Sequence, residues 1–182
     1  MSCRDTHLVE KIKFSDRNAY KELFLKFYEP LCQFTWTYTR SRHISEELVQ
    51  DVFLTVWELR ENLNPEQNIR SYLYQSVRNS ALNHIKHKRL AEEYNRDIEW
   101  LEPLPAVQHH SYEGNSNLEQ NVKQAINDLP DGARRIYSLS RNEGLTYREI
   151  ATVLDISIKT VESQMSRALR KMRNALSEYV KA

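Results

Sequence analysis

The chain contains little glycine, proline or cysteine. Only three of its 182 residues are Gly and five are Pro, whereas Leu, Glu, Arg, Asn and Lys are plentiful. This composition predicts a mostly helical, all-α protein. The two cysteines, Cys3 and Cys32, provide neither a disulfide framework nor the spacing of a metal site.

Long apolar runs and catalytic motifs are also missing. No apolar stretch approaches the length of a membrane span, and the N-terminus lacks a secretory apolar segment. A reducing cytoplasm is therefore the simplest location. The chain has no Gly-rich phosphate loop, no HExxH and no GxSxG. His84 and His87 have a metal-like spacing, but no Cys, Asp or Glu lies close to them in sequence, and a solvated basic face is favoured. We expect no enzyme activity, no cofactor and no metal.

Charge is nearly balanced overall, at a formal +1, but it is unevenly distributed. Residues 1–90 hold 14 basic and 11 acidic side chains. Residues 91–118 hold 1 basic and 6 acidic side chains, and residues 119–182 hold 11 basic and 8 acidic side chains. Two mildly basic segments thus flank an acidic one. The pattern agrees with two nucleic-acid-facing domains and a connecting segment that does not bind DNA, although a charge run alone is usually solvated surface.

The stretch 144–173 carries the strongest functional pattern. Thr146 and Glu149 have the spacing of a capping box, and Asp155 stands at a turn before a second cap at Ser157. This arrangement predicts a helix-turn-helix. Apolar residues at three- and four-residue steps predict the buried face of its second helix: Ile158, Val161, Met165, Ala168, Leu169 and Met172. From 159 to 173 there are five basic residues and one acidic residue, a face that suits the DNA major groove. Taken alone, the stretch also fits an ordinary amphipathic hairpin.

The N-terminal half reads as several helices. We expect caps at Ser15 and Ser45, an end or kink at Pro30, and a helix over 46–61. That helix has a wide apolar stripe, whereas Glu47, Gln50, Asp51, Leu54 and Glu58 lie off its centre and are free to face a partner. A further helix runs from about Ile69 towards Leu90, with Tyr72, Leu73, Val77, Leu82 and Ile85 on its buried side. Weak helix formers around Asn79 favour a local break there.

The acidic stretch reads as a linker. It contains prolines, a glycine and paired histidines, with a short helical start over 92–100. Ser116 and Glu119 again have capping-box spacing, Leu129-Pro130 ends the helix that they open, and Gly144 stops the next one. We therefore predict two small helical domains, residues 1–90 and 118–182, joined by an acidic flexible linker over 91–117.

Three stretches in order resemble one family, the bacterial RNA polymerase sigma factors of the extracytoplasmic-function class. ELVQDVFLTVW resembles the helix that binds core polymerase, and IRSYLYQSVRNSALNHIKHKR resembles the helix-loop-helix that melts and reads the minus-ten promoter element. LP followed by GLTYREIATVLDISIKTVESQMSRALRKMR resembles the domain that reads the minus-thirty-five element. The resemblance covers roughly residues 10–90 and 118–176.

The resemblance implies roles for three groups of residues. Gln50, Asp51, Phe53 and Trp57 match the region that meets the clamp helices of the polymerase β′ subunit. The minus-ten group is Arg78, Asn79, Asn83, Lys86, Lys88 and Arg89, in which Asn79 matches a loop residue that accepts a flipped base. The minus-thirty-five group is Lys159, Thr160, Glu162, Ser163, Ser166, Arg167, Arg170 and Lys171. Glu162 and Ser166 differ from the residues that are frequent at these positions in the family. The resemblance therefore does not predict which minus-thirty-five sequence is preferred.

The implied function is that of a sigma factor, a binding subunit that gives RNA polymerase its promoter specificity. The implied partners are core RNA polymerase, promoter DNA and an anti-sigma factor, which in this family is often anchored at the inner membrane. An alternative function that the same residues allow is that of a one-component helix-turn-helix regulator, which binds DNA without polymerase. A third interpretation, an interaction protein or enzyme with an incidental helix-turn-helix, lacks support from the N-terminal half.

Overall fold

The computed structural model describes residues 3–94 and 117–175, and all regular secondary structure within them is helical, as predicted. The first group of helices is α1 (Cys3–Lys13), α2 (Arg17–Thr39), α3 (Arg42–Glu58), the 3₁₀ turn η1 (Arg60–Asn62) and α4 (Ile69–Tyr94). The second group is α5 (Asn117–Asn127), α6 (Asp131–Arg141), α7 (Tyr147–Leu154) and α8 (Ile158–Ala175). None of these helices combines the length and apolar character that crossing a membrane requires.

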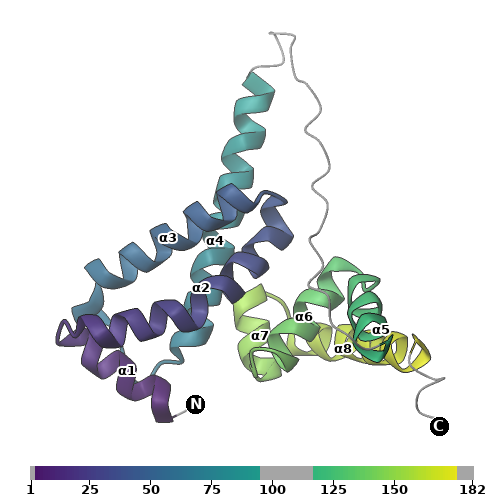
Figure 1. Cartoon of the computed structure of the whole chain (residues 1–182). Coiled ribbons are helices and arrows are strands. Elements are labelled where there is room, and N and C mark those ends of the chain that lie inside the picture. Colours follow the sequence, from purple (N-terminus) through teal and green to yellow (C-terminus); the bar gives the residue numbers. More distant parts are fainter. Residues whose placement is uncertain (1–2, 95–116, 176–182) are drawn as a thin grey trace.

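The three long helices α2, α3 and α4 pack against one another, and α1 packs against α2, α4 and η1 (Figure 1). Their shared core includes Leu23, Phe27, Leu31, Val49, Val56, Leu73 and Val77. Polar groups also fix the packing, because the Tyr20 hydroxyl donates to the Phe53 carbonyl at 2.8 Å. Asp5 on α1 is buried and pairs with Lys26 of α2 and Arg70 of α4. One carboxylate therefore ties three helices together.

Two predicted helix starts are wrong by a few residues. α2 is capped by Asp16, whose side chain accepts from the backbone N–H groups of Asn18 and Ala19, whereas Ser15 precedes the cap with φ of 63°. α3 is capped by Ser41 and not by Ser45. The Ser45 hydroxyl is buried and donates instead to the Ser41 carbonyl at 2.7 Å. A serine can make this bond inside a helix, so the residue type alone misplaces the cap.

At two positions where the sequence favours an interruption, the helix continues. α2 continues through Pro30, between the buried residues Phe27 and Leu31. α4 continues through Asn79 without a break, between Val77 and Ala81, both fully buried. The local cost is about 0.7 kcal/mol or less for a weak helix former such as Asn79 and about 3 kcal/mol for Pro30. Each helix continues because apolar side chains on both sides of the position are buried.

The second group contains the predicted helix-turn-helix. Thr146 and Glu149 form a reciprocal capping box at the start of α7, and Asp155 ends that helix in the left-handed region with φ of 51°. The Ser157 hydroxyl then accepts from the Thr160 N–H at 3.0 Å, which caps α8. Gly144 has φ of +66° and occupies the turn between α6 and α7. The expected cap at Ser116 lies outside the described residues.

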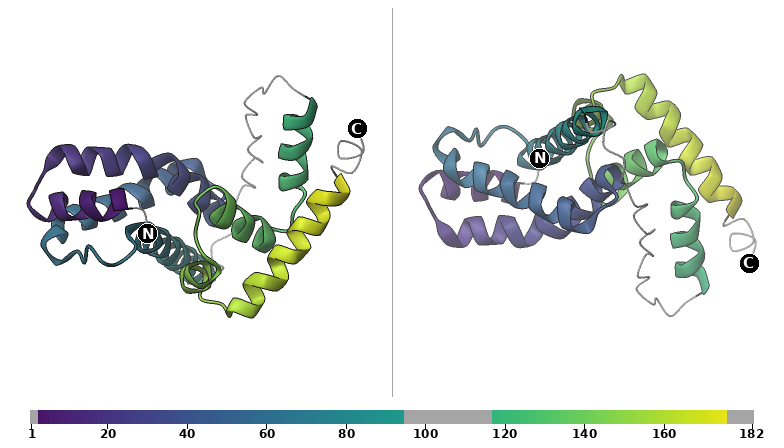
Figure 2. Two further views of the ribbon diagram at one scale, coloured as in Figure 1. Left: turned by 90° about the horizontal axis from the view of Figure 1, so that it is seen from below. Right: turned by 90° about the horizontal axis from the view of Figure 1, so that it is seen from above.

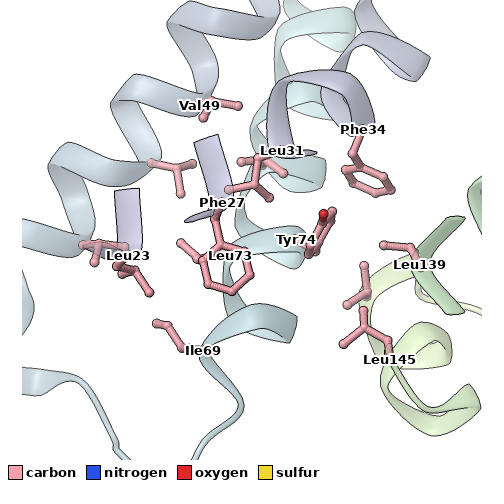
Figure 3. Close-up of a cluster of buried hydrophobic side chains, with 14 of the residues drawn as sticks. Leu23, Phe27, Leu31, Phe34, Val49, Ile69, Leu73, Tyr74, Leu139 and Leu145 are labelled. Carbon is pink, nitrogen blue, oxygen red and sulfur yellow. The ribbon is translucent and has the colours of Figure 1, made fainter. Parts of the chain in front are cut away.

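The two groups of helices touch each other (Figure 2). α7 packs against α4, and α6 meets α2. Figure 3 shows Phe34 and Tyr74 of the first group facing Leu139 and Leu145 of the second. All four side chains are buried and belong to one continuous cluster. We call this boundary the interdomain seam, defined by Phe34, Tyr38, Arg40, Asn68, Arg70 and Tyr74 on one side and by Asp131, Arg135, Leu139, Glu143, Leu145 and Glu149 on the other.

Candidate nucleic-acid and polymerase interface

The outer face of α3 presents most of the residues expected to bind polymerase. Gln50 and Asp51 are exposed, and the Gln50 amide donates to the Tyr28 hydroxyl at 3.3 Å. Leu54, one turn beyond Gln50, is 55% exposed. This face therefore combines an amide, a carboxylate and an apolar side chain, all accessible to a partner.

Trp57 and Phe53 differ in accessibility. Trp57 is half-buried, with its ring 4.9 Å from that of Tyr20 and the Arg60 guanidinium 4.8 Å above it. Phe53 is only 1% exposed and packs on Phe24. Its side chain supports α3 from inside the core and is not available for contact with a partner, contrary to the expectation from sequence. Helical periodicity carried this signal, because Phe53 falls on the apolar stripe of the helix, which is buried at Val49, Val52 and Val56.

The C-terminal half of α4 extends away from the rest of the molecule (Figure 1). Asn79, Asn83 and Lys86 are exposed and lie at spacings of four and three, so they share one face. Lys88 and Arg89 are exposed near the end. Leu82, predicted to be buried, is instead 39% exposed, because Ala81 fills the inward position. The minus-ten group thus lies on a projecting helix and not in a loop.

Arg78 lies apart from that exposed face. It is half-buried and contacts the Tyr38 phenol, and its guanidinium also donates to Asn79 Oδ1 at 3.4 Å. Burial raises the pKa of Tyr38, and the nearby Arg135 and Arg78 oppose that shift. The Arg135 guanidinium lies 4.6 Å from the Tyr38 ring centre. Arg78 therefore adjoins the interdomain seam as well as the exposed Asn79.

The two faces of α8 separate cleanly. Val161, Met165, Ala168 and Met172 are buried, and Leu169 is half-buried, as the sequence predicts. Ile158 was expected among them but is 42% exposed, because it stands at the first position of the helix beside the turn. The exposed residues include the whole predicted minus-thirty-five group: Lys159, Thr160, Glu162, Ser163, Ser166, Arg167, Arg170 and Lys171.

Within that exposed group, position around the helix distinguishes the residues. Ser163, Arg167 and Arg170 recur at spacings of four and three on the side opposite Val161 and Met165. Lys171 lies to one side, and its ammonium donates to the Asp128 carbonyl at 3.1 Å. It therefore already caps the end of α5, which sequence reasoning did not anticipate.

A hollow beside the helix turn adds side chains that were not singled out from the sequence. Its lining includes Arg148 and Thr152 of α7 with Ile156, Ser157 and Ile158. Arg148 and Thr152 are both exposed. Their spacing of four places them on one face of α7, and this periodicity was the signal available in the sequence. Within the described residues, no cluster of His, Cys, Asp and Glu is arranged to hold a metal ion.

Two family models match the chain, one over each group of helices. Residues 23–90 match sigma-70 region 2, and residues 119–172 match sigma-70 region 4. Among curated proteins, the RNA polymerase sigma-H factor of Pseudomonas aeruginosa is 25% identical over 98% of this chain and 96% of its own length. The ECF RNA polymerase sigma-E factor of Haemophilus influenzae is 26% identical, over 94% and 95% respectively.

The chain belongs to the extracytoplasmic-function sigma factors of the sigma-70 family. As a sigma factor it is not an enzyme but a subunit that directs RNA polymerase to initiate transcription at specific promoters. The alternative of a one-component regulator fails, because region 2 is matched in addition to the helix-turn-helix.

Solved structures share the fold of this sigma factor. The sigma factor RpoE of Bartonella quintana, solved with the anti-sigma factor NepR, has a TM-score of 0.62 and 25% identity, covering 87% of this chain and 96% of that one. CnrH, solved with the cytosolic domain of CnrY, has a TM-score of 0.59 at 19% identity, covering 96% and 98%. The latter likeness supports the fold alone.

Proposed function

We propose that this sigma factor binds the β′ clamp helices of core polymerase through the exposed face of α3. Gln50, Asp51 and Leu54 form the contact, and Trp57 forms its half-buried edge. The observation that supports this assignment is the coexistence of accessible polar and apolar groups on one face of a helix whose other face is buried. Phe53 is excluded from the contact because it lies in the core.

The charge reversal Asp51→Arg tests this assignment. We expect it to weaken binding to core polymerase at least tenfold, the loss that is typical of a hot-spot residue in an interface. Glu10→Arg is the matched control, because Glu10 is an exposed acid on α1, away from the proposed contact. Both variants should retain the helical circular dichroism of the parent. Equal polymerase affinity for the two variants would rule out this face.

The projecting half of α4 is proposed to read the minus-ten element. Asn79 and Asn83 offer amides for hydrogen bonds with unstacked bases, and Lys86, Lys88 and Arg89 supply positive charge for the backbone. Since α4 is unbroken, the base must reach the helix surface at Asn79. Asn79→Ala should reduce the discrimination between bases at one minus-ten position, by about 1–3 kcal/mol. Transcription from a set of single-base promoter variants measures this, with the exposed Asn62→Ala as control. An unchanged ranking of those promoters would refute the role.

The exposed face of α8 is proposed to enter the major groove of the minus-thirty-five element. Ser163 and Arg167 read bases, and Arg170 contacts phosphate, with Lys159, Thr160 and Ser166 at the edges. Arg170→Ala should weaken binding to all DNA sequences alike. It should also reduce the slope of log K against log salt concentration by about 0.9. Arg167→Ala should instead change the sequence that is selected. The reverse result would show that α8 sits rotated in the groove.

Glu162 and Lys171 occupy the flanks of that face. We propose that Glu162 repels phosphates and keeps the DNA affinity of the free protein low. Lys171 keeps its bond to the Asp128 carbonyl and adds charge near the backbone. Glu162→Gln should therefore raise the affinity of the free protein for duplex DNA without changing its sequence preference, as a filter-binding titration would show. A shift in preference would instead make Glu162 a base reader.

The domain limits that we propose are residues 1–90 for polymerase binding and the minus-ten element, 91–117 for the acidic linker, and 118–182 for the minus-thirty-five element. The protein works where its polymerase does, in the cytoplasm.

We also propose an anti-sigma partner, because the similar RpoE structure contains one. Leu25 on α2 is 68% exposed and, with Leu54, supplies apolar surface for it. Recovery of fully active protein with no partner from non-induced cells would count against this proposal.

A further inference from the structure

The Arg78 side chain joins two helices of the first domain. Its guanidinium bonds with the Tyr38 phenol on α2, and it also donates to Asn79 Oδ1 on α4 at 3.4 Å. Arg78 is half-buried, and the neighbouring Val77 is fully buried, so the core fixes the backbone at this point of α4. The guanidinium thus connects a side chain packed on the core to the exposed amide that we propose reads a minus-ten base.

Tyr38 is held firmly by the core. Its ring packs edge-on against Phe34, with the ring centroids 5.4 Å apart, and Phe34 is only 6% exposed. Tyr38 itself is half-buried near the end of α2. A side chain packed in this way keeps a single rotamer, so its phenol oxygen stays in one place. The phenol therefore gives the Arg78 guanidinium a fixed partner.

The chemistry of arginine decides how the Asn79 amide is oriented. Arginine has five N–H donors and no acceptor, so the amide must turn its carbonyl oxygen towards the guanidinium. Asn79 is exposed, and Nδ2 with its two hydrogens then points into solvent. The positive charge of Arg78 also repels any second donor that approaches Oδ1. Asn79 therefore presents donors to a base, whereas its acceptor is occupied.

The four bases differ in what they offer to such a donor. Guanine and thymine carry keto oxygens, which accept hydrogen bonds, whereas adenine and cytosine carry amino groups, which donate them. A free asparagine amide pairs with adenine by donating to one atom and accepting from another. An amide whose oxygen is held by arginine loses the accepting half of that pair, and it therefore favours a keto base.

We propose that Arg78 is a positioning residue that orients the Asn79 amide for keto bases, and that Tyr38 holds Arg78 in place. This inference rests on the proposed function of α4. Arg78 acts on the base through Asn79, unlike Lys86 and Lys88, whose exposed charges face the DNA directly.

Selection from promoters randomised across the minus-ten element, with holoenzyme assembled from core polymerase and the full-length protein, measures this preference. The readout is the ratio of keto to amino bases at the position where Asn79→Ala relaxes selection. Arg78→Met removes the donors but keeps a long, helix-forming side chain. We expect it to lower the ratio about two- to tenfold, the effect of one hydrogen bond. Asn79→Asp should reverse the preference, because a carboxylate offers only acceptors.

Two further variants separate the bond from its surroundings. Tyr38→Phe deletes only the phenol oxygen and should lower the ratio in the same direction, with no further effect when it is added to Arg78→Met. Arg135→Met is the matched control, because the Arg135 guanidinium of α6 lies 4.6 Å from the centre of the same Tyr38 ring. It should leave the ratio unchanged.

Several results would overturn the proposal. A parent that selects adenine or cytosine at this position would contradict the orientation of the amide, as would Asn79→Asp with the parental ratio, even if Arg78→Met failed to fold. Arg78→Met that weakens binding to every promoter alike would make Arg78 a phosphate contact. An equal shift in Arg135→Met would assign the effect to the second domain. Relaxed selection in Asn79→Ala would still support the proposed function of α4, which fails only if Asn79→Ala changes no position.

Discussion

The rotation of α8 about its own axis decides which residues hold the fold and which are free to read DNA. Met165 is 2% exposed, whereas Ser163, two residues earlier, is exposed. Two residues correspond to about 200° around a helix. Met165→Ala should therefore cost about 2–5 kcal/mol through lost burial and the cavity that remains. Ser163→Ala should change the free energy of unfolding by no more than about 0.5 kcal/mol.

Thermal unfolding followed by circular dichroism measures both effects. For a domain of this size each kcal/mol lowers the melting temperature by about 4–8 °C. Met165→Ala should thus lower the melting temperature by at least about 8 °C. The molecules that remain folded should keep the promoter preference of the parent. Ser163→Ala should melt with the parent yet select a different minus-thirty-five sequence. If Ser163→Ala were the destabilising variant and Met165→Ala the neutral one, the assignment of the two faces would be refuted.

Three further outcomes follow from local contacts. Thr146→Ala removes the acceptor for the Glu149 N–H and should lower the free energy of unfolding by about 0.5–2 kcal/mol, measured by urea titration. Burial raises the pKa of Cys32 to about 11, so its thiol should react with a disulfide reagent at pH 8 much more slowly than free cysteine does. Arg40 lowers the pKa of Asp131 from its ordinary 3.8, and that of Glu149 is lowered from 4.5 because hydrogen bonds from Thr146 outweigh burial. The stability that these two carboxylates contribute should therefore be present above pH 4.5 and be lost as the pH falls through the lowered values, which urea titrations from pH 7 to 3 would show.

Much of the local structure could be predicted from the sequence, because short-range patterns dictate it. The capping box at Thr146, the left-handed turn at Asp155 and the cap at Ser157 depend only on neighbours within a few positions. The errors arose where distant packing prevailed. Asn79 stays helical because Val77 and Ala81 are buried on either side of it. Leu82 faces water because Ala81 takes the inward position.

The interdomain seam could not have been predicted from one sequence. Asn68 and Glu149 are 81 residues apart, and each has a sufficient local explanation as a helix cap. Arg70 reads as an ordinary residue of an amphipathic helix, although it meets Asp5, Phe27 and the Glu143 carbonyl at once. Charge and periodicity describe the two domains as independent units. Only their relative placement shows that these side chains have second partners.

The continuity of α4 has a practical consequence for building chimeras from sigma factors. One rigid helix carries seam residues at its start and promoter-reading residues at its end, with no hinge between Tyr74 and Asn79. Exchanging the first domain for that of a relative would therefore transplant half of the seam together with the new promoter preference. Such a hybrid would join surfaces that do not fit each other, and its output would report loosened docking as well as altered recognition. A graft that moves Asn68, Arg70 and Tyr74 together with Glu143 and Glu149 would keep the two effects apart.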